Sequence, residues 1–170
     1  MSTRLGGSLP PIALAASVLL VGCASGSPQS GAATFRDEHA GQAARMAAAT
    51  KAVELEISRL SPAPSSAQLA GLARAAAQAH GDAARASAWN VAGRGEEGAE
   101  EEDVPRAETQ VTEGAGEMAS AMSALQAYAK GPSAASLARY MSELAGGQTQ
   151  WNEGISQLWY LAHASDPPTI

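Results

Sequence analysis

Three histidines offer side chains that can bind a metal or transfer a proton, and they lie far apart at His39, His80 and His163. None belongs to an HxxxH or Glu-x-x-His spacing, the arrangement that places ligands on one face of a helix in a di-iron bundle. A helical bundle would still bring His39 near His163 if the first helix begins where the last one ends. We expect structural roles for all three histidines and no metal site.

Four methionines fall on the apolar faces of predicted helices, at Met46, Met118, Met122 and Met141. Thioethers that gather inside a bundle suit copper(I), yet methionine is also a common filler of irregular gaps in a hydrophobic core. We interpret these four as core residues. The sequence has no GxSxG nucleophile motif and no phosphate-binding glycine motif, so we expect neither enzymatic activity nor a cofactor.

The only cysteine, Cys23, follows a segment typical of an export signal. A leader with one basic residue, Arg4, precedes the apolar run from Ile12 to Val21, and small residues come next. An apolar run of this length spans about 15 Å as a helix, which is roughly half the hydrocarbon thickness of a bilayer. We therefore interpret residues 1–22 as a cleaved signal peptide rather than a membrane anchor.

The sequence Leu20-Val21-Gly22-Cys23 resembles the lipobox of bacterial lipoproteins, and the resemblance covers about the first 25 residues. It implies that the Cys23 sulfur receives a diacylglyceryl group, that a lipoprotein peptidase cuts just before Cys23, and that many bacteria also acylate the new amino terminus. Two acyl chains anchor a protein stably to a membrane. The alternative is an ordinary secreted protein cut after Ala24, because residues 22–24 also form a small-x-small cleavage site.

The charge of the chain excludes some partners. Its net charge is −6, with 11 basic against 17 acidic residues, and lysine is scarce. Nucleic-acid binding requires clustered lysine and arginine, and an anionic membrane surface repels an acidic protein. We therefore expect no nucleic-acid partner and attachment to the cell membrane through lipid rather than through charge.

The rest of the chain favours helices, because alanine is abundant and aromatic residues make up only 4% of the sequence. Apolar residues recur at helical spacing in four segments. The expected segments are a tether over 23–33, helices over 34–60, 66–91, 105–130 and 133–163 within a domain over 34–164, an acidic loop over 93–104, and a disordered tail over 165–170.

Local residue types set the expected helix boundaries. The expected helix starts are a cap at Thr34, a cap at Ser65 or Ser66, a first turn containing Pro105, and a start at Pro132 or Ser133. The apolar pattern of the last helix continues through residues 146 and 147, both glycines, so we predict one helix there rather than two.

Four helices of similar length, about 40 Å each, predict an antiparallel up-down-up-down four-helix bundle. The alternative is a pair of helical hairpins that completes a bundle only by dimerising. Gln148 is the polar residue placed most squarely on an interior face, and Thr50 on the first helix is the partner expected for its side chain. A contact between Gln148 and a bound ligand is the functional alternative.

The topology also predicts a partner-binding surface. It places six ring side chains at the end where the first helix begins: Phe35, His39, Trp89, Trp159, Tyr160 and His163. Trp89 and Trp159 lie at the edges of their apolar faces, so we expect them to be partly exposed and to join Tyr160 and His163 in contacting a partner. The alternative is that these aromatic residues close the end of an alanine core.

The sequence thus predicts a non-catalytic lipoprotein that displays a helical bundle on the extracytoplasmic face of the cell membrane, where it meets an envelope protein. Its alanine-rich composition resembles that of small, uncharacterised actinobacterial lipoproteins. The alternative function is binding of a small ligand or a metal in the bundle interior.

Overall fold

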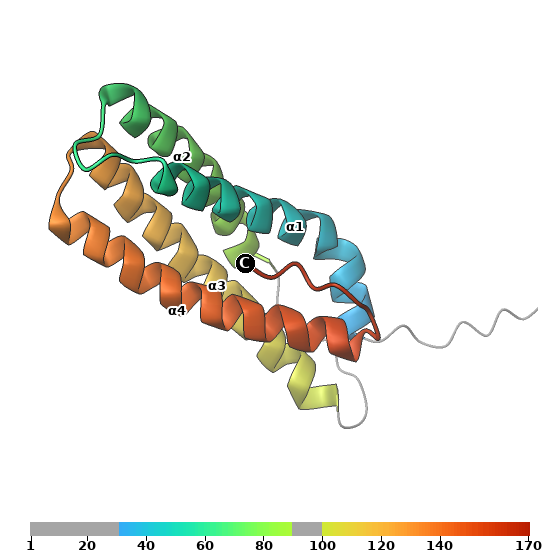
Figure 1. The fold of residues 1–170 in the computed structure, drawn as a ribbon. Helices are drawn as coiled ribbons and strands as arrows, with labels where there is room; N and C mark the ends of the chain where they lie inside the picture. Colours follow the sequence, from blue (N-terminus) through green and yellow to red (C-terminus); the bar gives the residue numbers. More distant parts are fainter. Residues whose placement is uncertain (1–30, 90–99) are drawn as a thin grey trace, which may run out of the picture.

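The computed structural model describes residues 31–89 and 100–170, which form four α-helices and no strand. The helices are α1 (Gly31–Ser58), α2 (Ser66–Ser87), α3 (Glu100–Lys130) and α4 (Ala134–Leu161). Figure 1 shows them packed as a bundle, which confirms the prediction of an all-α four-helix protein. Within the described residues, no helix has the length and apolar character needed to cross a membrane.

Successive helices run in opposite directions, so each end of the bundle collects two helix starts and two helix ends (Figure 1). One buried cluster joins Phe35 near the start of α1 to Trp89 just after α2 and Leu158 near the end of α4. A second cluster joins Val53 near the end of α1 to Leu72 near the start of α2. We call the end with the first cluster the aromatic end and the other the far end.

Serine side chains cap two of the helices where the sequence predicted. The Ser65 hydroxyl accepts a hydrogen bond from the Gln68 N–H at 3.2 Å, and the Gln68 side chain accepts one from the Ser65 N–H at 2.9 Å. This capping box satisfies two backbone donors at the start of α2. Ser133 caps α4 by accepting from the Ser136 N–H at 3.2 Å.

The first helix begins earlier than the sequence predicted. Because α1 starts at Gly31, Thr34 lies inside the helix instead of capping it, and residues 31–33 of the expected tether are helical. The reason is burial, since Ala32 is 0% exposed and packs in the core of the aromatic end. Residues 1–30, with the expected signal peptide and Cys23, lie outside the described residues.

The third helix also begins earlier than predicted. It starts at Glu100, so residues 100–104 of the expected acidic loop are helical and Pro105 lies beyond the first turn. Val104 explains the extension, because its side chain is 2% exposed and joins the core of the aromatic end. The remainder of the expected loop, residues 93–99, lies outside the described residues.

Glycine residues let α3 and α4 pack with their backbones in contact. A Cβ atom added at Gly114 would lie 2.6 Å from the backbone nitrogen of Trp151 and 2.8 Å from the carbonyl oxygen of Gly147. A Cβ atom at Gly154 would lie 2.6 Å from the carbonyl oxygen of Ala107. Only glycine permits backbones to approach this closely, and α4 accordingly packs far more extensively against α3 than against α1.

The fourth helix is continuous through Gly146 and Gly147, as predicted. The expected contact between Gln148 and Thr50 does not form. Gln148 is only half-buried and donates a hydrogen bond to the Glu54 carboxylate at 3.3 Å. Thr50 is buried, but its hydroxyl donates to a carbonyl oxygen one turn earlier in α1, at 3.1 Å. A threonine hydroxyl can donate to a backbone carbonyl of its own helix and so needs no partner across the bundle.

Three of the four methionines predicted in the core are there. Met46, Met118 and Met122 are each 0% exposed. Met141 was predicted wrongly, because 62% of it is exposed. The neighbouring residue Tyr140 takes the inward position on α4 and is 4% exposed, which turns Met141 toward solvent.

Candidate interaction site at the aromatic end

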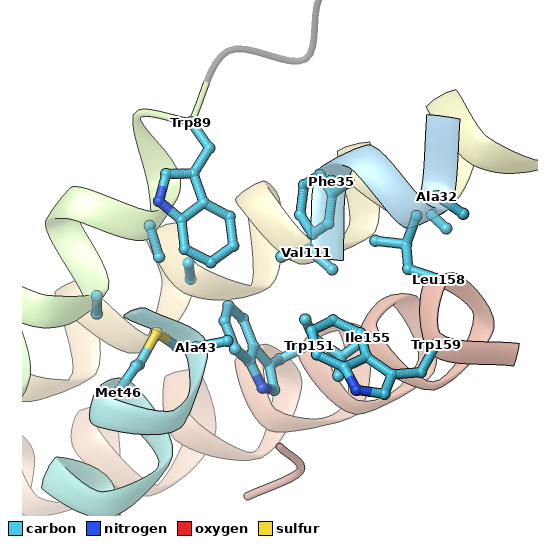
Figure 2. Packing of buried hydrophobic residues seen from close by; sticks show 14 of the residues in the cluster. Ala32, Phe35, Ala43, Met46, Trp89, Val111, Trp151, Ile155, Leu158 and Trp159 are labelled. Carbon is cyan, nitrogen blue, oxygen red and sulfur yellow. The ribbon is translucent and has the colours of Figure 1, made fainter. Parts of the chain in front are cut away.

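Ring side chains from α1, from the residue just beyond α2 and from α4 meet in the core of the aromatic end. Figure 2 shows Phe35, Trp89 and Trp151 converging there. The ring centroids of Phe35 and Trp89 are 5.5 Å apart, edge to face, and His39 stacks on Trp89 at 4.3 Å. Trp151 lies 5.9 Å from Trp89. These are separations at which aromatic pairs stabilise a core, so the rings hold three parts of the chain together.

The two tryptophans predicted to be partly exposed are buried. Trp89 is 8% exposed and Trp159 is 5% exposed, and both belong to the core cluster in Figure 2. Small neighbours such as Ala43 and Ala86 leave space that the large indoles fill. The prediction that Trp89 and Trp159 are partly exposed is therefore wrong, and their burial agrees with the alternative of closing the core.

The other two residues of the predicted surface face solvent. Tyr160 is 78% exposed and His163 is also exposed. Adjacent residues of a helix point about 100° apart, so burial of Trp159 turns Tyr160 outward. The predicted surface is thus divided between two core residues and two surface residues.

The histidines have separate structural environments. His39 contacts Phe35 edge to face at 4.7 Å and stacks on Trp89. His80 Nδ1 lies 2.9 Å from the carbonyl oxygen of Ala119, so a protonated Nδ1 donates from α2 to α3. Within residues 31–89 and 100–170, no three His, Cys, Asp or Glu side chains are grouped so that they could hold a metal ion.

A tight reversal follows the end of α4. The His163 N–H donates to the Tyr160 carbonyl at 3.0 Å, and the Ala164 N–H donates to the Trp159 carbonyl at 2.9 Å. These two bonds define a Schellman motif. Its left-handed position is normally a glycine, but here it is His163, with φ of 51°. The motif turns the chain back along α4.

Residues 165–170, which we call the strap, were predicted to be disordered but pack on the bundle. Figure 1 shows this segment running back from the end of α4 along the side that faces α1. The Trp151 indole N–H donates to the Pro168 carbonyl at 3.2 Å. The Asn152 side chain donates to the Ile170 carbonyl and accepts from the Ile170 N–H, both at 2.8 Å. The prediction of a disordered tail is wrong because these bonds and the packing of Ile170 hold the strap in place.

Sequence reasoning missed Trp151 and Asn152 as residues of this site. Trp151 lies on the apolar face of α4, and that position by itself indicates only a core residue. The consecutive prolines Pro167 and Pro168 restrict the backbone of the strap, but proline is also common in disordered segments, so they did not indicate packing on the bundle. No sequence signal pairs Asn152 with Ile170, because the contact depends on the reversal at His163, where glycine is the usual residue.

Searches against protein-family models, curated proteins and solved structures find no match to this chain.

Proposed function

We propose that this protein is a lipoprotein, anchored at the extracytoplasmic face of the cell membrane by acyl chains on Cys23, whose helical bundle binds an envelope protein without catalysing a reaction. One observation carries the proposal: the sole cysteine ends the lipobox-like segment Leu20-Val21-Gly22-Cys23, directly after an export signal. An exported protein with one thiol has no intrachain disulfide to form, so the cysteine needs another use.

The surface at the aromatic end supports the partner-binding part of the proposal. Tyr160 offers a rigid ring with a polar tip to solvent, and tyrosine is common among the residues that dominate protein contacts. The backbone groups bound by Trp151 and Asn152 belong to a peptide segment, the strap. This end of the bundle therefore already contains peptide-binding side chains.

Substitution of Cys23 by serine tests the anchor. We expect Cys23→Ser to abolish incorporation of a labelled fatty acid and to leave the protein either as uncut precursor or in the medium. Ser25→Ala, two residues along, is the matched control and should keep both the label and the membrane location. A processed Cys23→Ser protein that remains in the membrane fraction would contradict lipid anchoring.

Mass spectrometry of the amino-terminal peptide distinguishes the secreted alternative. A lipoprotein begins at Cys23 and carries the added acyl mass, whereas the secreted form begins at Ser25 and carries none. Crosslinking in intact cells then tests the partner, and we expect Tyr160→Ala to reduce the crosslinked protein without changing the melting temperature.

Binding of a small ligand or metal in the bundle interior is the second hypothesis from the sequence. Native mass spectrometry and elemental analysis of the purified protein distinguish it, because only this hypothesis predicts an added mass that does not come from lipid.

A further inference from the structure

We infer that the seam between α1 and α4 at the aromatic end is a binding groove for a short proline-containing segment of another protein, and that the strap occupies this groove as a displaceable internal ligand. The inference deepens the partner-binding part of the proposed function and does not depend on lipidation of Cys23.

The groove recognises the peptide backbone. Asn152 uses both halves of its amide on one residue, donating to the Ile170 carbonyl and accepting from its N–H at 2.8 Å each. The Trp151 indole N–H adds a third bond, to the Pro168 carbonyl. Main-chain hydrogen bonds of this kind supply affinity for many peptide sequences. A segment from another protein can therefore form the same three bonds.

Two features of the strap define the class of ligand. The Thr169 N–H donates to the Pro167 carbonyl at 2.8 Å, which forms a γ-turn centred on Pro168. Proline fixes φ near the value that this turn needs, so less freedom is lost on binding. The Ile170 side chain packs against the core cluster of the aromatic end. The expected ligand has two consecutive prolines and an aliphatic residue two positions after the second.

The strap lies on the surface of the bundle, above a side chain that belongs to the core. All of residues 165–170 are exposed or half-buried, whereas Trp151 beneath them is 0% exposed. The strap joins α4 through His163 and itself contains Asp166, whose φ angles of 51° and 57° are left-handed conformations that side chains disfavour. Release of the strap would relax the backbone at Asp166, whereas His163 keeps its conformation because its bonds are to α4.

Because the strap is attached to α4, it would control the access of other peptides to the groove. A tethered segment competes at an effective concentration in the millimolar range. A free peptide must overcome that competition, so the intact chain should bind it weakly. Weakening the strap alone should therefore raise the affinity of the groove for the same peptide.

The test uses the full chain purified in detergent and a fluorescent, amidated peptide with the sequence of residues 164–170. Ile170→Asp in the protein places a charge against the core cluster and should release the strap. We expect this variant to bind the peptide at least tenfold more tightly than the unsubstituted chain, as measured by fluorescence anisotropy. Adding Asn152→Ala to the variant should then weaken binding at least tenfold.

Two controls separate groove binding from nonspecific adhesion and from unfolding. The peptide carrying Ile170→Asp should bind the released variant at least tenfold more weakly than the original peptide. Circular dichroism should show equal helix content in all three proteins. If Asn152→Ala disturbs the helices, Asn152→Asp, which keeps the acceptor but removes the donated bond, replaces it.

Failure of the folded Ile170→Asp variant to bind the peptide would overturn the inference. Equal binding by the intact and released chains would also overturn it. If the intact chain forms a dimer that Ile170→Asp dissociates, the groove binds the strap of a second copy. That result would exclude a segment of another protein as the ligand. None of these results bears on lipidation, which is measured on Cys23.

Discussion

The fourth helix contacts its two neighbours in different ways. Toward α3, Gly114 and Gly154 remove the side chains from between the helices, and the backbones touch. Toward α1, Trp151 joins α1 residues in the core cluster of the aromatic end, and Gln148 donates a hydrogen bond to Glu54. Small residues thus close one seam, whereas the other stays wide enough to receive the strap. A bundle rich in alanine and glycine is therefore not equally close-packed on all sides.

The largest expected effect comes from removing the indole at the α1–α4 seam. Trp151 is 0% exposed and contacts Trp89, so Trp151→Ala should lower the free energy of unfolding by about 4 kcal/mol. Chemical denaturation followed by circular dichroism measures the loss. Tyr160→Ala, on the same helix but 78% exposed, should change stability by less than about 0.5 kcal/mol. Equal effects of the two substitutions would refute the assigned burial.

The α3–α4 seam should be destabilised by adding atoms rather than by removing them. Gly114→Ala places a Cβ atom 2.6 Å from a backbone nitrogen that has little room to move, so we expect a loss of about 3 kcal/mol. Gly81→Ala is the matched control, because its Cβ atom would meet only the end of the Arg85 side chain at 3.6 Å. That variant should gain up to about 1 kcal/mol from helix propensity. A stabilising Gly114→Ala would contradict backbone contact.

The far end of the α1–α4 seam should be sensitive to high pH. Burial, and next the charge of Glu54 on α1, raise the pKa of Tyr140 from 10.0 to about 12. The folded state thus favours the neutral phenol. The contribution of Tyr140 to the free energy of unfolding is therefore complete below pH 10. It is lost as pH rises from 10 to 12. The shift corresponds to about 3 kcal/mol, which solvent screening around the hydroxyl reduces to about 2 kcal/mol.

Stability measured across this pH range, together with tyrosinate absorbance, checks the effect. Tyr140→Phe should remove the corresponding fall in stability. Glu54→Gln should lower the pKa of Tyr140, because it removes the negative charge that opposes ionisation. A Tyr140 that ionises at its ordinary pKa would place its side chain outside the seam.

The smallest predicted effect is at the reversal that starts the strap. His163 adopts φ of 51°, a conformation that costs glycine little and other residues about 1 kcal/mol or more. His163→Gly should therefore stabilise the protein by up to about 1 kcal/mol. Ala162→Gly, one residue earlier and with φ of −80°, should instead destabilise it. Differential scanning calorimetry can resolve the opposite signs, and a loss of stability in both would argue against the Schellman motif.

The sequence was sufficient to predict the four helices because their information is local. The cap at Ser65 and the apolar pattern through Gly146 and Gly147 predicted what the structure shows. The early starts of α1 and α3 escaped prediction, because burial of Ala32 and Val104 extends both helices past their polar start signals.

The candidate site was less predictable, because it depends on contacts between distant segments. The topology correctly gathered Phe35, His39 and Trp89, but the pattern of a single helix does not show how much space four helices leave between them. That space is what buries Trp89 and Trp159. The strap was missed for the same reason, since Asn152 and Ile170 meet only after the chain reverses.

Contact between the strap and α4 is the central claim, and nuclear Overhauser spectroscopy of the whole chain tests it most directly. The structure predicts cross-peaks from the Trp151 indole proton to Pro168, and from the Asn152 side-chain amide to the Ile170 amide proton. Trp151→Phe assigns the indole signal by its loss. Random-coil shifts for residues 165–170, without cross-peaks to α4, would contradict both the strap and the groove beneath it.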